Sequence, residues 1–364
     1  MARSLNQTAG ADNASVLLCR PQNAKNIAPP PAARYSTGMT AEIIDGIGQK
    51  QAAIHAAVTV LKDGQPVVIP TETVYGLAAD ATNPTAITRI YETKGRPRFN
   101  PLICHMADLA MAERHAEFDP ISKKLAEKFW PGPLTLILPL KEEGRQIHPL
   151  ATAGLDSVGI RVPKGFTSDL IRAFDRPLAA PSANTSGKIS PTSARHVADD
   201  LGEKLALIID GGSAPVGVES TILRVEDGKI RLLRPGGLSV EDIEAATGLT
   251  VERREGPAAI IEAPGMLASH YAPGAAVRLD ATHVEAGEVL IRFGGVVVEG
   301  IEQAKAVFDL SPSGDLAEAA ANLFDYLKRA DATGAERIAV TAIPQHGLGE
   351  AINDRLVRAA APRE

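Results

Sequence analysis

Hydrophobic residues alternate between helical and strand-like spacing along most of this chain. Apolar positions recur at helical spacing from Ile54 to Leu61 and Gly64 follows as a stop, whereas residues 66–69 form a short apolar run typical of a buried strand. Further strands are expected at 102–104, 134–138, 157–162, 178–180 and 205–210. The first two-thirds of the chain is therefore predicted to be an α/β structure.

Two helices in this part carry clear boundary signals. The first begins at Asn83-Pro84, where an N-cap residue precedes a proline in the first turn, and ends at Gly95. The second begins at Asp119-Pro120 and is ended by Pro131-Gly132.

A hairpin is expected further along. Residues 221–225 and 229–233 have strand character and flank Asp227-Gly228, a pair that favours a tight antiparallel turn. Parallel crossovers and a hairpin together predict a mixed, twisted sheet with flanking helices and not a pure Rossmann fold.

The pattern breaks between residues 252 and 275, which are rich in proline and glycine and contain the run SHYAPG. This segment is predicted to be a linker with a further role as a lid. Beyond it a small Rossmann-like βαβ domain is expected, over 276–364, with strands at 289–291, 306–308 and 338–340 and helices at 315–330 and 349–360. The first domain is then expected over 39–251 and the linker over 252–275.

Residues 1–38 differ from the rest because they have few large apolar residues and contain three consecutive prolines at 29–31. We expect a disordered extension, with a cleaved or interacting tail as the alternative, and Met39 as an alternative start. The role of this segment is not given by the sequence.

Composition excludes several classes of protein. The formal net charge of -6 gives no global attraction to nucleic acid, and the aromatic content of 4% argues against a base-stacking platform. Cys19 and Cys104 stand far apart, so a disulfide framework and a structural zinc site are both excluded. No apolar run approaches the ~20 residues that span a bilayer, and a reducing, cytoplasmic location is expected.

The densest polar motif is KGRPRFNPL, at the end of the helix that Gly95 terminates. Lys94, Arg96 and Arg98 fall within five residues there. A solvated basic turn that complements the helix dipole is one interpretation. A phosphate clamp is the other, because a polyphosphate needs several fixed cations. The motif GxxxxGK[ST] of Walker ATPases is absent, as are HExxH and GxSxG.

A second motif, APSANTSGKISPT, follows the strand that ends at Ala180. Ser190 before Pro191 predicts a helix N-cap, and the hydroxyls and amides of Ser182 and Asn184 could also form an anion site at a helix N-terminus. Arg161, at a strand end, fits either a surface ion pair or a carboxylate site. His105 and Ser220 are open to both structural and binding interpretations.

Taken together, VVIPTETVYGLAADA, KGRPRFNPL, SVGIRVP, APSANTSGKISPT, GVESTI and LLRPGG occur in one order. In this the chain resembles the YrdC-like threonylcarbamoyl-AMP synthases over residues 48–250. The run APGMLASHYAPG and the second domain resemble the long, two-domain branch of that family. The resemblance implies a YrdC-like twisted sheet with a large, positively charged concave cavity.

The resemblance also implies roles for individual residues. Lys94 and Arg96 would be catalytic, through charge stabilisation. ATP would be bound by Lys94, Arg96, Asn100, Ser157, Ser182, Asn184, Ser190, Arg234 and Tyr271. Threonine would be bound by Thr73, His105, Arg161, Ala180 and Ser220. No residue is implied as a metal ligand, and magnesium would arrive on the ATP phosphates.

The implied activity joins L-threonine, bicarbonate and ATP into threonylcarbamoyl-AMP and pyrophosphate, the first step of a tRNA base modification. The product would pass to a tRNA threonylcarbamoyl transferase machinery, with weak tRNA contact and no membrane. Two alternatives remain: a double-stranded RNA-binding module without turnover, and an enzyme that moves another carbamoyl group. The sequence gives neither the oligomeric state nor the identity of the transferase, nor whether the linker gates the site.

Overall fold

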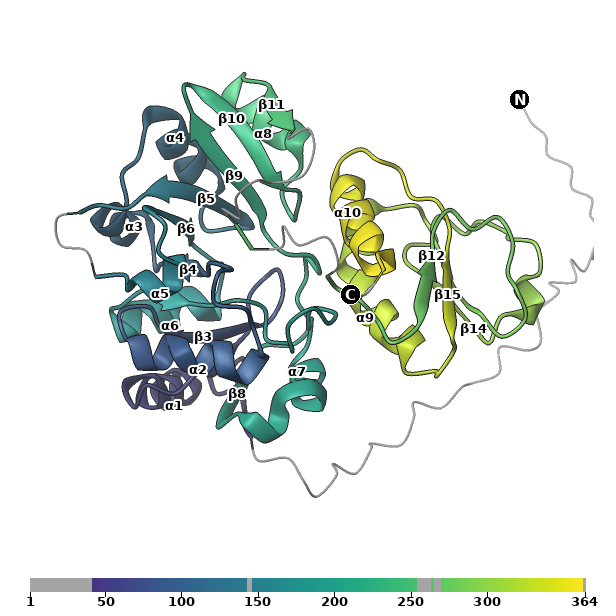
Figure 1. The fold of residues 1–364 in the computed structure, drawn as a ribbon, viewed down its shortest axis with the longest axis horizontal. Helices are drawn as coiled ribbons and strands as arrows, with labels where there is room; N and C mark the ends of the chain where they lie inside the picture. The colour runs from purple at the N-terminus through teal and green to yellow at the C-terminus, as the bar shows by residue number, and fades with distance from the viewer. Residues whose placement is uncertain (1–40, 143–145, 254–262, 265–269, 363–364) are drawn as a thin grey trace, which may run out of the picture. The chain divides into compact units, whose positions relative to one another are not determined.

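The computed structural model describes residues 41–142, 146–253, 263–264 and 270–362 (Figure 1). These residues all belong to one compact unit, Gly38–Glu364. The expectations for residues 1–38, and those for most of the segment 252–269, fall outside the described residues.

A mixed sheet of eleven strands forms the first part of the fold. Its order is β1-β8-β2-β3-β7-β4-β6-β5-β9-β10-β11, with parallel and antiparallel neighbours. The bounds are β1 Glu42–Asp45, β2 Val67–Ile69, β3 Gly76–Asp80, β4 Ile103–His105, β5 Leu134–Pro139, β6 Ser157–Arg161, β7 Leu178–Ala179, β8 Leu207–Asp210, β9 Thr221–Glu226, β10 Lys229–Arg234 and β11 Val251–Arg253. The mixed sheet predicted from the sequence is confirmed.

Helices flank this sheet, and their boundaries follow the local signals. They are α1 Lys50–Lys62, α2 Pro84–Lys94, α3 Leu109–His115, α4 Pro120–Phe129, α5 Pro149–Thr152, α6 Phe166–Phe174, α7 Ala194–Leu201 and α8 Val240–Thr247, with a short 3₁₀ turn η1 at Gly202–Lys204. The Asn83 side chain accepts the amides of Thr85 and Ala86, and Gly95 ends α2 at φ 61°. Both features were predicted, because asparagine favours the N-cap and glycine the left-handed C-terminal position.

The predicted hairpin is also confirmed. Strands β9 and β10 pair antiparallel, with Lys229 opposite Glu226. Asp227 and Gly228 have φ values of 50° and 75°, the left-handed pair that a tight hairpin turn requires.

The predicted N-cap at Ser190 is wrong. Helix α7 starts four residues later, at Ala194, and its N-cap is Ser193, whose hydroxyl accepts the His196 amide. The reason is tertiary: the Pro191 carbonyl accepts the Tyr75 amide at 2.9 Å, so this segment runs extended beside β3. Ser190 instead donates to Glu219.

A second, four-stranded sheet follows, with all neighbours parallel and the order β12-β15-β13-β14. Its elements are β12 Ala276–Arg278, β13 Val289–Arg292, η2 Ile301–Gln303, β14 Ala306–Asp309, α9 Leu316–Asp331, β15 Arg337–Val340 and α10 Leu348–Ala360. The Rossmann-like βαβ prediction is confirmed, and the short elements β12 and η2 were not expected. Among the described residues, no helix is both long enough and apolar enough to cross a bilayer.

Buried apolar side chains from the strands of the large sheet and from its flanking helices form the main core. The three residues of β2 are fully buried, which explains their unbroken apolar run. A second apolar cluster is built on α9 and α10 and also includes Val74, Ile189 and Val218 from the first part of the chain. The described residues after 270 therefore pack directly on the loops that follow the large sheet.

Candidate functional site

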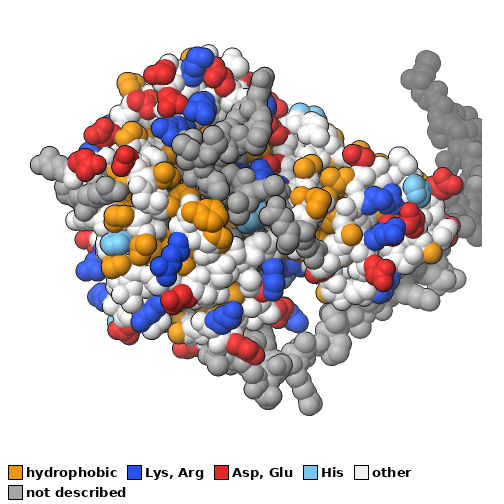
Figure 2. All heavy atoms as spheres, viewed as in Figure 1, with side chains coloured by type: hydrophobic (Ala, Val, Ile, Leu, Met, Phe, Trp, Pro, Cys, Tyr) orange, Lys and Arg blue, Asp and Glu red, His pale blue; other side chains and the backbone are white. Residues whose placement is uncertain are grey.

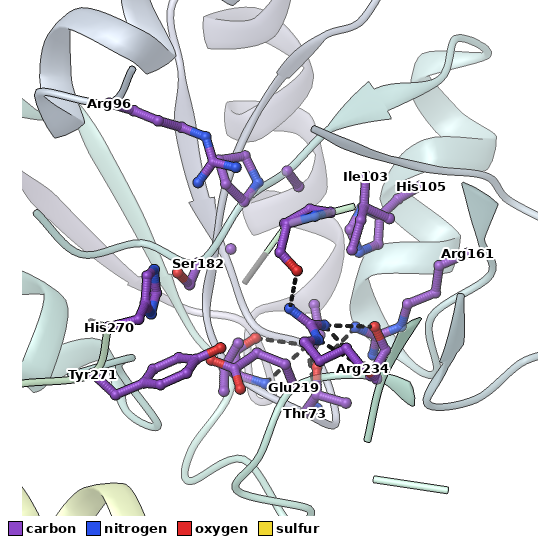
Figure 3. A pocket seen from close by; sticks show the side chains of 17 residues that line it. Thr73, Arg96, Ile103, His105, Arg161, Ser182, Glu219, Arg234, His270 and Tyr271 are labelled. Atoms are coloured by element: carbon purple, nitrogen blue, oxygen red, sulfur yellow. Dashed lines mark hydrogen bonds between the residues drawn. The ribbon is translucent and has the colours of Figure 1, made fainter. Parts of the chain in front are cut away.

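A pocket that is partly open to solvent lies where several strands of the large sheet end. Strands β4 and β6 are parallel neighbours with His105 opposite Arg161, so both side chains reach the same edge. The loop before β3 adds Thr73, the segment after β7 adds Ala180 and Ser182, and the end of β10 adds Arg234. In Figure 3, Arg96, His270 and Tyr271 lie on one side of the pocket, and His105 and Arg161 lie on the other.

Arg161 is held in place by three partners. Its Nη1 donates to Thr73 Oγ1 at 2.8 Å, its Nη2 lies 2.8 Å from Glu72 Oε1, and its Nε donates to the Gly132 carbonyl at 3.3 Å. Both side chains of the Arg161–Glu72 pair are buried. Two of the five N–H donors of this guanidinium make these hydrogen bonds, and Nη2 meets Glu72 as an ion pair without a hydrogen bond.

His105 is a neutral imidazole in this pocket. Burial, and then the nearby Arg161, lower the pKa of His105 to about 3. Its Nδ1 has no hydrogen-bond partner within the described residues. A buried polar atom without a partner costs free energy, and a polar ligand group in the pocket would satisfy it.

Lys94 and Arg96 play different structural roles. Lys94 Nζ donates to the Ser182 carbonyl at 2.5 Å and also to the Asn184 carbonyl. Burial, and then Arg96, lower the pKa of Lys94, but two carbonyl acceptors favour the ammonium form. Lys94 therefore pins the loop that carries Ser182, behind the pocket wall.

Arg96 itself lines the pocket. Its Nε and Nη2 donate to the carbonyls of Asn100 and Pro101, at 3.3 and 3.0 Å. Burial lowers the pKa of Arg96 to about 10, so it remains a cation at neutral pH. A fixed, desolvated guanidinium of this kind suits an anionic ligand.

Arg234 joins the two sides of the pocket. Its Nη2 donates to the Ser220 carbonyl at 2.8 Å, and its Nη1 donates to the Pro264 carbonyl at 3.3 Å. The Ser220 hydroxyl in turn lies 2.8 Å from Thr135 Oγ1. Ser220 and Arg234 both line the pocket, and these bonds hold them in place there.

Glu219 is the acidic member of the pocket lining. It accepts from Ser190 Oγ at 2.5 Å and from Arg355 Nε at 2.7 Å. Burial alone would raise the pKa of Glu219, but Arg355, Arg234 and Ser190 outweigh it and hold that pKa at about 2. The close approach of Gly236 fixes the Glu219 backbone: a Cβ at position 236 would meet the Glu219 carbonyl at 2.3 Å.

His270 and Tyr271 complete the side of the pocket that carries Arg96. Their rings pack edge to face at 4.1 Å, and Tyr271, at φ 63°, stacks on Phe324 of α9 at 5.4 Å. Burial lowers the pKa of His270 to about 3. The nearby Glu219 carboxylate acts in the opposite direction and raises that pKa, whereas the cations Lys94, Arg96 and Arg234 lower it further. The His270 Nδ1 also has no partner within the described part of the chain.

The pocket brings together nine of the residues predicted to form the site. They are Thr73, Arg96, His105, Arg161, Ala180, Ser182, Ser220, Arg234 and Tyr271. The other five are not in its lining: Lys94, Asn100, Asn184 and Ser190 lie directly behind lining residues, and Ser157 starts β6, at the opposite end of that strand from Arg161.

Three charged residues of the network were not predicted. Glu72 belongs to the quoted motif TETVYGL, so an acidic residue beside the expected Arg161 site was a usable signal. Glu219 likewise lies in GVESTI. Arg355 had no signal, because its partner lies 136 residues away in the sequence.

The charge distribution of the remaining surface is mixed. Acidic and basic side chains are interspersed over the face shown in Figure 2. Among residues 41–142, 146–253, 263–264 and 270–362, no group of three or more His, Cys, Asp or Glu side chains is arranged to hold a metal ion.

Comparison with known proteins gives consistent matches along the chain. A family model described as "Telomere recombination" matches residues 59–236, and one described as "Threonylcarbamoyl-AMP synthase, C-terminal domain" matches residues 238–361. The threonylcarbamoyl-AMP synthase of Pyrococcus abyssi is 42% identical, over 85% of this chain and 94% of its own length. That of Bacillus subtilis is 40% identical, over 88% and 97%.

Solved structures that are similar to this chain point to the same family. The crystal structure of P. abyssi Sua5 complexed with L-threonine has a TM-score of 0.75 and 39% identity, covering 84% of this chain and 94% of that one. A P. abyssi Sua5 variant, in which an adjacent histidine and tyrosine are replaced by alanine, has a TM-score of 0.79 and 37% identity, covering 88% and 96%.

Proposed function

This chain belongs to the threonylcarbamoyl-AMP synthase family, and we propose that its pocket joins L-threonine, bicarbonate and ATP into L-threonylcarbamoyladenylate and pyrophosphate. The observation that carries the proposal is 42% identity over 94% of the length of a curated relative of that name. Threonine and ATP follow as substrates from that activity. The relatives favour it over the two alternatives considered above, an RNA-binding module and a transferase for another carbamoyl group.

The side of the pocket around Arg161 is the proposed threonine site. Arg161 lines the pocket, and its guanidinium keeps N–H donors that would suit a carboxylate. The unpartnered Nδ1 of His105 and the hydroxyl of Ser220 supply polar partners for the amino-acid hydroxyl and amine, with the backbone at Ala180 beside them. Supporting this placement, the similar P. abyssi Sua5 was crystallised with L-threonine.

The opposite side is the proposed triphosphate site. Besides Arg161, the cations in the pocket lining are Arg96 and Arg234, and Ser182 lies beside His270 on the side of Arg96 (Figure 3). Lys94 and Asn184 act on the phosphates indirectly, by fixing the Ser182 loop, and Asn100 and Ser190 fix Arg96 and Glu219 in the same way. Tyr271 lies where it would contact the nucleotide. Ser157 has no such place in the pocket, and its assignment depends on the family resemblance alone.

The reaction needs no protein nucleophile. The threonine amine attacks the carbon of CO2 derived from bicarbonate and releases a proton, which leaves a carbamate. A carbamate oxygen then bonds to the α-phosphorus of ATP, the bond to the β-phosphate oxygen breaks, and pyrophosphate leaves. The pocket contributes orientation of the two reactants and cationic stabilisation by Arg96 and Arg234.

Magnesium, transfer partner and location belong to the same proposal. Glu219 is already paired with Arg355 and Ser190, so a magnesium ion would be held by phosphate oxygens and water, on which it would neutralise charge. The adenylate would pass to a tRNA threonylcarbamoyl transferase in the cytoplasm, with only weak tRNA contact. We also propose the division into 39–251, the linker 252–275 and 276–364.

The test is turnover with purified full-length protein. ATP, L-threonine, bicarbonate and magnesium together should release pyrophosphate and form the adenylate, and omission of any one should stop both. Arg96→Ala should weaken ATP affinity roughly ten- to a hundredfold, since a charge-assisted contact is worth ~1.5–3 kcal/mol. Arg98→Ala is the matched control, because Arg98 is exposed and outside the pocket lining. Pyrophosphate release that does not require threonine would refute the proposal.

A further inference from the structure

Arg355 of helix α10 is a fully buried cation in the C-terminal part of the chain. Its guanidinium makes three polar contacts: Nε with Glu219 Oε2 at 2.7 Å, Nη1 with Asp354 Oδ2 at 2.5 Å, and Nη2 with the Pro235 carbonyl at 3.0 Å. The same group lies over the Tyr271 ring, 5.1 Å from its centre. A buried charge with this many partners has one fixed orientation.

Two of these contacts are residues that line the pocket. Glu219 and Tyr271 face it, whereas Arg355 lies behind them. Each Glu219 oxygen has one partner, Ser190 on one side and Arg355 on the other. Tyr271 lies between Arg355 and Phe324 of α9, so both helices of the C-terminal part hold its ring.

We infer that Arg355 is a positioning residue for the proposed reaction: from helix α10 it fixes Glu219 and Tyr271, and through them the nucleotide side of the pocket. The inference rests on the proposed function, because it assigns this wall to ATP. It gives the C-terminal domain a direct part in the site. Removal of Arg355 would free the Tyr271 ring and leave the Glu219 carboxylate with Ser190 and the neighbouring Arg234 only.

Loss of Arg355 should also give a pH signature. The groups that face Glu219 are Arg355 from α10, Arg234 from β10, the Ser190 hydroxyl, and the rings of Tyr271 and His270. With Arg355 present, the pKa of Glu219 is about 2 and the carboxylate stays ionised throughout the assay range. Without it, burial raises that pKa, so Glu219 gains a proton as the pH falls and activity falls with it.

The experiment compares Arg355→Met and Arg355→Lys with the parent full-length chain. Methionine retains much of the buried volume without the charge, and lysine retains the charge without the planar fork. Arg253→Met is the matched control: Arg253 pairs with Glu350 of the same helix at 2.8 Å, but the Arg253 side chain is exposed and neither residue lines the pocket. Steady-state rates are measured at pH 5.5–8.5, together with thermal melting of each variant.

We expect Arg355→Met to lower kcat/KM for ATP roughly a hundredfold, the effect of a small misplacement of a catalytic wall. The ratio of variant to parent activity should fall further toward pH 5.5, because that ratio cancels the titration of threonine, bicarbonate and ATP. The kcat/KM of Arg355→Lys should lie between those of the parent and Arg355→Met. The kcat/KM of Arg253→Met should match the parent value at every pH.

Three results would overturn the inference. One is a folded Arg355→Met with parental kcat/KM. Another is a loss that is equal at all pH values and shared by Arg253→Met, which would mean that α10 only holds the domains together. If Arg355→Met does not fold, parental kcat/KM in Arg355→Lys would overturn it, since the fork geometry would be dispensable. A parent chain that forms no adenylate would instead refute the proposed function.

Discussion

Two buried imidazoles should make this protein lose stability between pH 7 and pH 5. His105 and His270 both face the pocket, and burial lowers the pKa of each to about 3. In the unfolded chain a histidine has a pKa of ~6.5, so as the pH falls below that value the unfolded state binds protons that the folded state does not. The stabilisation is therefore complete above pH ~6.5 and is lost on the way down to pH ~3.

The magnitude follows from the two pKa values. Between pH 7 and pH 5, each histidine costs about 2 kcal/mol of unfolding free energy, and the two together about 4 kcal/mol. Glu219 does not contribute in this range, because its pKa of about 2 affects stability only below the ordinary glutamate value of ~4.3. His115 is also buried, and burial and then Arg114 lower its pKa, so it adds a further loss to the parent and the variants alike.

Urea unfolding of the ligand-free protein at several pH values measures this loss, with the fluorescence of Trp130, the single tryptophan, as the signal. His105→Gln and His270→Gln should each reduce the loss between pH 7 and pH 5 by about half, to about 2 kcal/mol. His55→Gln, on the exposed side of α1, is the control and should leave the loss unchanged. Parental pH dependence in both pocket variants would show that neither imidazole is held neutral by the fold.

Three further predictions concern ligands and boundaries. The threonine side should accept serine weakly and reject valine strongly, because valine leaves buried polar groups unpaired; turnover with each amino acid tests this, and faster turnover of valine would contradict it. Tyr271→Phe keeps the ring that stacks on Phe324, so its melting temperature should stay parental while the KM for ATP rises about tenfold if one hydroxyl contact is lost; an unchanged KM would remove the hydroxyl from ATP binding. A chain that begins at Met39 retains every described residue and should match the full chain in melting temperature and turnover; a large drop in either would assign residues 1–38 a role in the fold.

Local signals in the sequence were enough for much of the fold. Asn83 and Gly95 bound α2, and Asp227-Gly228 makes the hairpin turn, because cap and turn preferences act between residues close in sequence. The Ser190-Pro191 signal was locally as good, yet it failed. There the Pro191 carbonyl bonds to the Tyr75 amide, and a contact across 116 positions outweighs a cap preference.

In the site, too, features that depend on contacts between residues distant in sequence could not be predicted from local signals. The pairing of His105 with Arg161 depends on the register of β4 and β6, which spacing alone does not give; only the family resemblance placed the two side chains together. The charged partners of the pocket residues were harder still to predict from the sequence. Glu219 and Arg355 are 136 residues apart, and each alone has the appearance of an ordinary surface charge in the sequence. Long-range ion pairs leave no periodic pattern to detect.

The strand order has a consequence for synthesis of the chain. Strand β2 lies between β3 and β8, and β8 begins about 140 residues after β2 ends. At ribosomal rates of roughly 5–20 residues per second, one edge of this wholly apolar strand stays unpaired for about 7–28 s before its neighbour is made. An unpaired apolar strand edge promotes association between chains, so we expect the nascent protein to be most prone to aggregation during that interval. Slower synthesis of residues 70–206 would lengthen it, and recombinant yield should fall accordingly.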